Sequence, residues 1–342
     1  MGLASLPATA FAAAGLARMA AAAGRFVRPD PAAAPLDVRA VVPARDEAGG
    51  IAACVAALLP QAAEVVVVDD DSADATAERA AGAGARVLRL AGDPPPGWTG
   101  KARACAAGAE GATTAWLAFV DADVVLAPGA LPALARATRR ASTSVAGGLA
   151  CSSFWERLLL PELGLALVQE GLPADFASGH CFLVRTGAYR EVGGHGHPAV
   201  RASPVEDRDL ARALGGHDAR LGPRMLRARM YRDLPALWDG LLKNQAGLHP
   251  RPLAHLVWLL GPVLAPRPWA AVVTSAGGRL AAGQNPLYGL GAPLARAVLA
   301  VNYLASRSRA RRGATVRWKG RAVAVGGGAR QSMRSMWTAD CL

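Results

Sequence analysis

From Val38 to Val120 the chain alternates between two kinds of segment. Short apolar runs, rich in valine and leucine, predict strands over 38–42, 64–68, 86–90 and 115–120. Stretches with apolar residues at helical spacing, or rich in alanine, predict helices over 51–59, 73–83 and 101–111. Strands that are apolar along their whole length are buried on both faces. The alternation therefore predicts an α/β fold, a mostly parallel sheet covered by helices.

The last third of the chain has a different pattern. Residues 253–275 and 287–304 are apolar, are broken by prolines, and are each near the length that spans a membrane. Arg267 and Arg296 interrupt them, so we interpret them as a membrane hairpin or as helices that lie in the membrane interface. Residues 3–23 form a further apolar, alanine-rich stretch, which is a candidate membrane anchor.

Composition refines this picture. Of the 342 residues, 52% are hydrophobic and 19% are charged, which allows a large core together with membrane segments. The formal net charge is +12, and residues 305–342 hold nine Arg or Lys against one acid. A basic tail after an apolar stretch, without an aromatic stacking platform, predicts contact with anionic lipid on the cytoplasmic side rather than with nucleic acid. The five cysteines form no C-x-x-C pair, which favours the reducing cytosol over a disulfide framework or a zinc site.

Acidic residues stand where two predicted strands end. Asp121-Ala122-Asp123 follows the strand 115–120, Asp69-Asp70-Asp71-Ser72 follows the strand 64–68, and a third acidic pair, Glu206-Asp207, lies downstream. Ligands of such sheets bind beyond the carboxyl ends of the strands, where carboxylates can hold a divalent cation and its diphosphate. Each motif alone is equally an ordinary turn, with Asp71 or Ser72 as a helix N-cap.

The first two strand ends also suggest a nucleotide pocket. Residues 41–47 and 66–76 would supply a carboxylate that accepts the imide N–H of uracil, a main-chain wall, and a serine that caps the next helix. Together these groups would form a base and ribose pocket. A dinucleotide-binding oxidoreductase would instead need Gly-x-Gly-x-x-Gly after the first strand, where this chain has Pro-Ala-Arg-Asp-Glu.

The order of these motifs resembles a known family. Pro43-Ala44-Arg45-Asp46-Glu47, the acidic run after residue 68, Gly97-Trp98-Thr99-Gly100-Lys101, Asp121-Ala122-Asp123 and Glu206-Asp207 resemble family 2 glycosyltransferases of the GT-A type, a Rossmann-like fold. The Gly97–Lys101 motif, Arg229-Met230-Tyr231, and Trp238 with Lys243-Asn244 resemble the membrane-associated branch that includes carotenoid- and hopanoid-linked enzymes. The match runs from about residue 38 to 244.

The resemblance implies roles for the donor side. Glu47 and Asp70 would contact the nucleotide base, and Pro43, Ala44 and Arg45 would line the same pocket. Lys101 would lie near the diphosphate or sugar, unless it is an ordinary exposed lysine in the first turn of a helix. Asp123 would be the direct metal ligand, and Asp121 would meet the ribose or a metal-bound water. The cation would be Mg²⁺ or Mn²⁺, since carboxylate and phosphate oxygens are hard ligands.

On the acceptor side, the resemblance implies that Asp207 is the general base of an inverting transfer. Glu206 would point elsewhere if the pair is extended; alternatively, both residues open a helix over 208–214, where carboxylates favour the helix dipole. His180 would take acceptor or sugar contacts in place of a glutamine that this branch often carries. Arg227 or Arg229 could grip the diphosphate, and Trp238 would lie at the membrane boundary, where a hydrophobic acceptor arrives.

These expectations combine into one hypothesis. We expect an apolar helix over 1–30, a GT-A glycosyltransferase domain over 31–250, membrane-associated helices over 251–306 and a basic cytoplasmic tail over 307–342. The protein would face the cytoplasm from the cell membrane and move a hexose from a UDP-linked nucleotide sugar to a hydroxyl or carboxyl of a lipid such as a carotenoid or hopanoid. Two alternatives stay open: polyprenyl phosphate as acceptor, and a noncatalytic scaffold that binds nucleotide or lipid.

Overall fold

The computed structural model describes residues 13–14, 17–18, 20–169, 176–231, 233–248, 252–264, 269–318 and 321–324. These residues form two compact units. The α/β unit draws on the described residues of 27–148 and 174–228, and the helical unit on those of 1–26, 149–173 and 229–326. The predicted domain boundaries after residues 30, 250 and 306 stay predictions.

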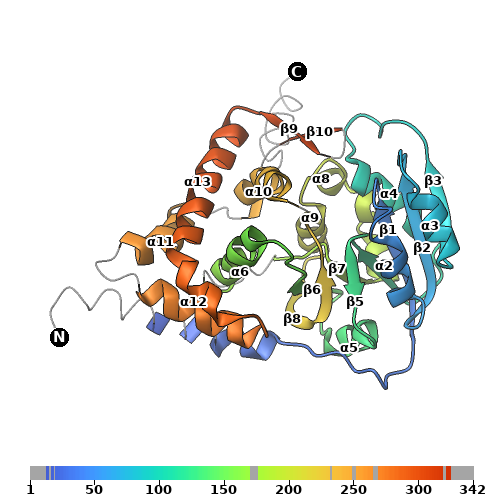
Figure 1. Cartoon of the computed structure of the whole chain (residues 1–342). Coiled ribbons are helices and arrows are strands. Elements are labelled where there is room, and N and C mark those ends of the chain that lie inside the picture. The colour runs from blue at the N-terminus through green and yellow to red at the C-terminus, as the bar shows by residue number, and fades with distance from the viewer. Residues whose placement is uncertain are drawn as a thin grey trace. The chain divides into compact units, whose positions relative to one another are not determined.

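An eight-stranded sheet forms the centre of the α/β unit (Figure 1), in the order β3-β2-β1-β4-β7-β6-β8-β5. Four strands are parallel: β1 (Leu36–Ala44), β2 (Ala62–Asp70), β3 (Arg86–Leu90) and β4 (Trp116–Val120). The remaining four are β5 (Val124–Leu126), β6 (Ser142–Leu149), β7 (Cys181–Arg185) and β8 (His217–Ala228).

The predicted α/β fold class is confirmed, but the sheet is mixed rather than mostly parallel. Beyond β4 the pairs β4–β7, β6–β7 and β5–β8 are antiparallel. Parallel neighbours need a long crossover, which the three predicted helices supply only for the first four strands. The strands β1 and β2 are also longer than predicted. Backbone pairing of Asp70 with Leu90 carries β2 through its acidic end, since ladder hydrogen bonds do not depend on side-chain polarity.

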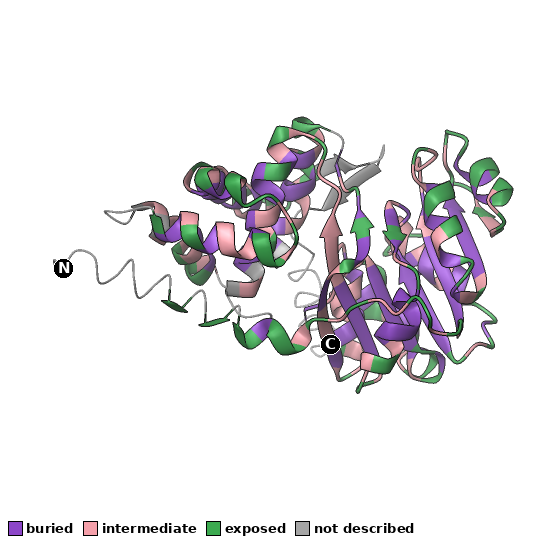
Figure 2. Ribbon diagram, turned by 60° about the horizontal axis from the view of Figure 1, so that its bottom comes forward, coloured by how far each residue is buried: buried purple, intermediate pink, exposed green. Residues whose placement is uncertain are grey.

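Helices cover the parallel part of the sheet. They are α2 (Ile51–Leu58), α3 (Thr76–Gly82) and α4 (Gly100–Ala109), close to the predicted ranges. The hydroxyl of Thr99 accepts a hydrogen bond from the Ala102 amide and so caps α4. A Cβ on Gly108 would lie 2.4 Å from Val41 Cγ1, so the glycine lets α4 pack closely on β1. Figure 2 shows the buried strands in purple beneath the partly exposed helices.

Further helices follow in the α/β unit. They are α5 (Ala130–Ala137), α7 (Thr186–Glu191), the 3₁₀ turn η3 (Gly194–Gly196), α8 (Pro198–Arg201) and α9 (Glu206–Ala213). The apolar core between the sheet and α4 includes Val41, Val68, Cys105, Phe119 and Phe182, each at most 2% exposed. This core fixes the start of α4 and the end of β4 relative to each other, and both carry predicted site residues.

The helical unit contains α6 (Phe154–Gln169), α10 (Leu234–Leu248), α11 (Pro252–Leu264), α12 (Trp269–Ala281), η4 (Pro286–Gly291), α13 (Ala292–Arg311) and the hairpin β9 (Thr315–Trp318)–β10 (Arg321–Ala324). The 3₁₀ turn η2 (Ala22–Arg25) belongs to the same unit. The long helix α13 packs against α6, α10 and α11 (Figure 1). The core of the helical unit is apolar, and its buried residues include Leu158, Leu237, Leu259 and Leu299.

Within the described part of the chain, one helical stretch, Pro286–Arg311, is long and apolar enough to cross a membrane, and 44% of its most apolar window is buried. The helices α11 and α12 have 13 residues each, which is short of the roughly 20 that a span needs. Residues 3–12, Arg267 and the tail beyond residue 324 lie outside the described residues, and so do the predictions that rest on them.

Candidate active site

Two loops join at the carboxyl ends of β1 and β2. The guanidinium of Arg45 donates from Nη1 to the carbonyl oxygen of Asp70 over 2.6 Å. The amide of Glu47 donates to the hydroxyl of Thr76 over 2.8 Å. The structure therefore brings together Arg45, Glu47 and Asp70, three residues predicted to line the base pocket. The other two, Pro43 and Ala44, are the last residues of β1 and lead into the same loop.

The two loops hold unusual backbone conformations. Asp46 has φ 53° and Asp71 has φ 61°, both in the left-handed region that non-glycine residues seldom adopt. Hydrogen bonds between the loops fix this arrangement: the Asp46 amide donates to Ser72 Oγ (3.0 Å), and Asp46 Oδ1 accepts from the Ala73 amide (2.8 Å). Such strain persists only where the surroundings hold it, and it gathers at ligand sites.

Three carboxylates surround one lysine at the ends of α4, β4 and α9. Lys101 Nζ lies 2.9 Å from Asp121 Oδ1, 2.6 Å from Glu206 Oε1 and 3.4 Å from Asp207 Oδ2. We call these four residues the Lys101 cluster. Their positions follow from local structure: Lys101 opens α4, Asp121 follows β4, and the acidic pair opens α9. Residues 106 apart in sequence thus meet in one place.

The interpretation of Lys101 as an ordinary exposed lysine is wrong, because two-thirds of its side chain is covered and it pairs with all three carboxylates. Glu206 does not point elsewhere. The pair begins the helix α9 instead of continuing an extended chain, so both carboxylates face Lys101. The helical alternative for this pair is therefore confirmed, and it leaves Asp207 within the cluster.

The cluster has an excess of negative charge, with three carboxylates against one ammonium. Burial raises the pKa of Asp207 to about 8; Lys101 opposes this shift, while Glu206 and Asp121 add to it. Burial alone would lower the pKa of Lys101, but the nearby carboxylates of Asp121, Asp207 and Glu206 raise it well above its ordinary value. Lys101 therefore stays charged, and Asp207 can exchange a proton near neutral pH.

Gly179 is a site residue that the sequence analysis did not select. A Cβ at this position would lie 2.6 Å from Asp207 Oδ2, 2.8 Å from Lys101 Nζ and 3.1 Å from Asp121 Oδ2. The backbone of Gly179 thus forms a wall of the Lys101 cluster. The signal was present in Ala177-Ser178-Gly179-His180, a segment from which only His180 was chosen.

His180 follows this wall. Burial lowers its pKa, with a smaller opposing effect from Asp121, so the ring is neutral at pH 7. A chain of hydrogen bonds holds the segment 177–180 against β6 and β8. The Ser178 amide donates to Ser144 Oγ (3.0 Å), and that hydroxyl lies 2.9 Å from His217 Nε2. The other ring nitrogen, Nδ1, lies 2.9 Å from Ser142 Oγ.

Two carboxylates at this site could bind a divalent cation. Among the described residues, no three His, Cys, Asp or Glu side chains gather as a preformed metal site. Asp121 and Asp123 follow β4. Burial raises the pKa of the Cys54 thiol, and the negative charges of Asp123 and Asp121 raise it further, so both carboxylates lie near that residue. Mg²⁺ is commonly held by one or two carboxylates while phosphate oxygens and water complete its shell. The two residues fit an ion that binds together with a diphosphate.

Two predicted site residues belong to the helical unit. Arg229 Nη2 lies 3.4 Å from Ser152 Oγ, and the carbonyl oxygen of Trp238 accepts a hydrogen bond from Asn302 Nδ2 over 3.1 Å. The roles of Arg229 at the diphosphate and of Trp238 at the acceptor stay predictions.

Comparison with known proteins shows similarity to glycosyltransferases. Residues 40–193 match the family model described as glycosyl transferase family 2. The chain is 38% identical over 86 residues to the 4,4'-diaponeurosporenoate glycosyltransferase of Staphylococcus aureus (strain USA300), and equally to that of strain NCTC 8325. The matched segment is 25% of this chain and 23% of the relative, so the chain spans about a quarter of the length of the curated relatives it matches.

A solved structure shows a similar fold. The mannosyltransferase of Pyrobaculum calidifontis, in complex with GDP-Man and Mn²⁺, superposes with a TM-score of 0.55 at 19% identity, over 90% of this chain and 98% of that one. A glucosyl-3-phosphoglycerate synthase from Mycobacterium tuberculosis reaches a TM-score of 0.43 at 20% identity, over 68% of this chain and 82% of that one. The first superposition confirms the predicted GT-A type of fold.

Proposed function

We propose that the protein, whose residues 40–193 match the family model of glycosyl transferase family 2, is an inverting enzyme that moves a hexose from a nucleotide sugar to a membrane lipid. The glycosyltransferase class and the nucleotide-sugar donor follow from the family. The observation that carries the mechanism is the Lys101 cluster, in which a buried carboxylate with a pKa near neutral lies beside a lysine that stays charged.

In this proposal the donor base binds at the rim that Arg45, Glu47 and Asp70 form, and its diphosphate lies toward Asp121. Asp207 takes the proton of an acceptor hydroxyl as the oxygen bonds to the anomeric carbon, while the bond from that carbon to the diphosphate breaks. Mg²⁺ or Mn²⁺ beside Asp121 and Asp123 would offset the charge left on the diphosphate. Lys101 holds the three carboxylates in place, and the Gly179 backbone leaves room beside them.

Exposed apolar residues support a lipid acceptor. On the helical unit, Leu253 is 76% exposed, and Leu280, Leu287 and Leu290 are each 69% exposed. Surfaces of this kind mark contact with membrane or hydrophobic ligand. A matched relative is named for the glycosylation of diaponeurosporenoate, which supports a carotenoid-type acceptor. Basic residues at the end of α13 favour the cell membrane with the catalytic domain in the cytoplasm.

The test is an assay of purified full-length protein with UDP- and GDP-hexoses and with a carotenoid acid, a hopanoid or polyprenyl phosphate as acceptor. GDP-sugars belong in the panel because the structurally similar mannosyltransferase binds GDP-Man. With a hydroxyl acceptor, Asp207→Asn should lower kcat about 10²–10⁴-fold while donor binding is retained. A carboxylic acid acceptor is already ionised at neutral pH, so transfer to it should not need this base.

The matched control is Asp209→Asn, which removes a carboxylate from the same turn of α9 but one that pairs with Arg212 outside the cluster. This control should keep its turnover. Undiminished transfer to a hydroxyl by Asp207→Asn would refute the base assignment. Transfer to polyprenyl phosphate alone, insensitive to Asp207→Asn, would select the anionic acceptor, which has no proton to lose.

A further inference from the structure

A pocket of about 400 Å³ opens between α11 and α13 in the helical unit. Pro252 and Leu256 line it from α11. The ring of Tyr303, which is fully buried, and the half-exposed side chain of Leu304 line it from α13. The pocket therefore has an apolar floor, made by side chains from two helices whose packing fixes its shape.

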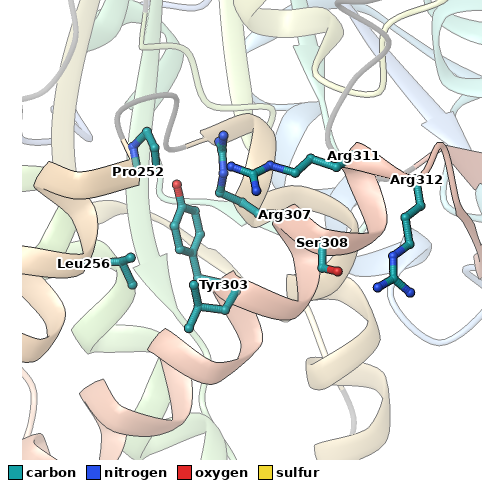
Figure 3. A pocket seen from close by; sticks show the side chains of 8 residues that line it. Pro252, Leu256, Tyr303, Arg307, Ser308, Arg311 and Arg312 are labelled. Atoms are coloured by element: carbon teal, nitrogen blue, oxygen red, sulfur yellow. The ribbon is translucent and has the colours of Figure 1, made fainter.

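Three arginines lie at the rim of this pocket: Arg307, Arg311 and Arg312. The side chains of Arg307 and Arg311 extend toward one another in Figure 3, and the Arg307 guanidinium lies 6.0 Å from the centre of the Tyr303 ring. Like charges four residues apart on a helix repel each other. No Asp or Glu occurs in the sequences of α11 and α13, so neither helix offers these arginines a carboxylate.

A helix C-terminus favours cations by itself, so the arginines alone would not indicate a ligand. The apolar floor is the second observation. Exposed apolar side chains stand next to it on the same two helices: Leu253 and Val257 on α11 are 76% and 50% exposed, and Val301 on α13 is 59% exposed. A ligand that fits both the arginine rim and the apolar floor needs an anionic group and a hydrocarbon chain.

We propose that this pocket binds the phosphate headgroup of an anionic phospholipid. The phosphate accepts hydrogen bonds from Arg307 and Arg311, and the first carbons of the lipid chain cover Leu256 and Leu304. The exposed leucines and valines beside the pocket then meet the acyl chains of the bilayer. Nucleic acid would match the arginines but not the apolar floor. The inference rests on the membrane association proposed above and not on the transferase chemistry.

The experiment uses full-length protein and two probes. The first is a soluble short-chain phospholipid, dihexanoyl phosphatidic acid, with inorganic phosphate in parallel, measured by calorimetric titration. The wild type should bind the phospholipid more tightly than phosphate, because only the phospholipid covers the apolar floor. Equal affinities for the two would overturn the assignment to a lipid.

Arg311→Gln should weaken binding of the phospholipid about tenfold, the factor that corresponds to one charge-assisted hydrogen bond. The matched control is Arg309→Gln, which removes the same charge from the same exposed turn of α13 at a position that does not line the pocket. Arg309→Gln should bind like the wild type. Equal losses in the two variants would show general charge attraction and overturn the pocket.

The second probe is flotation with vesicles of phosphatidylcholine, with and without phosphatidylglycerol. The wild type should prefer the anionic vesicles, and Arg311→Gln should lose more of that preference than Arg309→Gln. Failure of the wild type to bind any vesicle would overturn the membrane association itself. If the protein binds vesicles equally well with and without phosphatidylglycerol, and Arg311→Gln binds like the wild type, only the headgroup pocket would be overturned.

Discussion

Gly179→Ala tests whether the backbone wall of the Lys101 cluster controls the chemistry. The added Cβ would lie 2.6 Å from Asp207 Oδ2, whereas ordinary van der Waals contact begins at 3.4 Å. The carboxylate oxygen must therefore retreat by about 0.8 Å, and the Lys101 ammonium, 2.8 Å from the same carbon, must move as well. The atoms that must move are the ends of side chains rather than backbone.

This geometry predicts that stability and activity respond differently. Because flexible side-chain ends can give way, the variant should lose less than about 1 kcal/mol of unfolding free energy, below the usual cost of overpacking a core. Misplacement of a reacting group by about 1 Å can cost about 100-fold in rate. We therefore expect kcat to fall between about 10-fold and 100-fold, with the melting temperature nearly unchanged.

The measurement is sugar transfer by the purified variant, with thermal unfolding of the same sample. Gly187→Ala is the control, since a Cβ at that helical glycine in the same unit meets no atom within 4 Å. It should keep full activity, and removing a glycine from α7 should not destabilise the protein. Gly179→Ala with wild-type turnover would refute the role of this backbone, and equal losses in both variants would show that the substitutions act elsewhere.

Three other predictions follow from the same structure. Lys101→Met leaves three carboxylates without their shared cation, so thermal or urea unfolding should show a loss of about 1–3 kcal/mol together with lost turnover; unchanged stability would contradict the ion pairs. Burial lowers the pKa of His217 from 6.5 to about 4, so its neutral form stabilises the fold above pH 6.5 and that contribution is lost as the pH falls toward 4. The free energy of unfolding in urea should fall between pH 7 and pH 4.5 in both proteins, and the fall should be about 2–3 kcal/mol larger in the wild type than in His217→Gln. An equal fall in both proteins would show that the ring titrates normally. EDTA should abolish transfer and Mg²⁺ or Mn²⁺ should restore it, whereas full activity in EDTA would exclude the metal role of Asp121 and Asp123.

The regular first half of the α/β unit could be predicted from the sequence, because its pattern is local. An uninterrupted apolar run such as that before Asp121 specifies a buried strand wherever the neighbours lie. The antiparallel half was not predicted. The strands β6 and β8 contain Gly147, Gly148 and several arginines, so they lack an apolar run, and tertiary pairing rather than local propensity makes them strands.

The candidate site also contains residues that could be predicted from the sequence and residues that could not. Motif order placed Lys101, Asp121 and Asp207 in one site, and the structure brings their side chains together. The orientation of Glu206 depended on whether its segment is helical, which the acidic pair alone does not decide. Gly179 has no side chain to suggest chemistry, and its importance follows from what surrounds the empty space beside it. A residue that acts by leaving room is recognised only in three dimensions.

The helical unit shows why charge within an apolar run can mislead. Arg296 interrupts the run 287–304 and counted against a simple membrane span. In the structure its Nε donates to Glu162 Oε2 over 3.0 Å, and Arg279 Nη2 lies 3.3 Å from the other carboxylate oxygen, with all three side chains at most 4% exposed. Glu162 is 134 residues from Arg296, so no local pattern reveals the pair. Since these charges face inward while Leu294 and Val301 on the same helix are more than half exposed, the arginine is no argument against lipid on the outer face of α13.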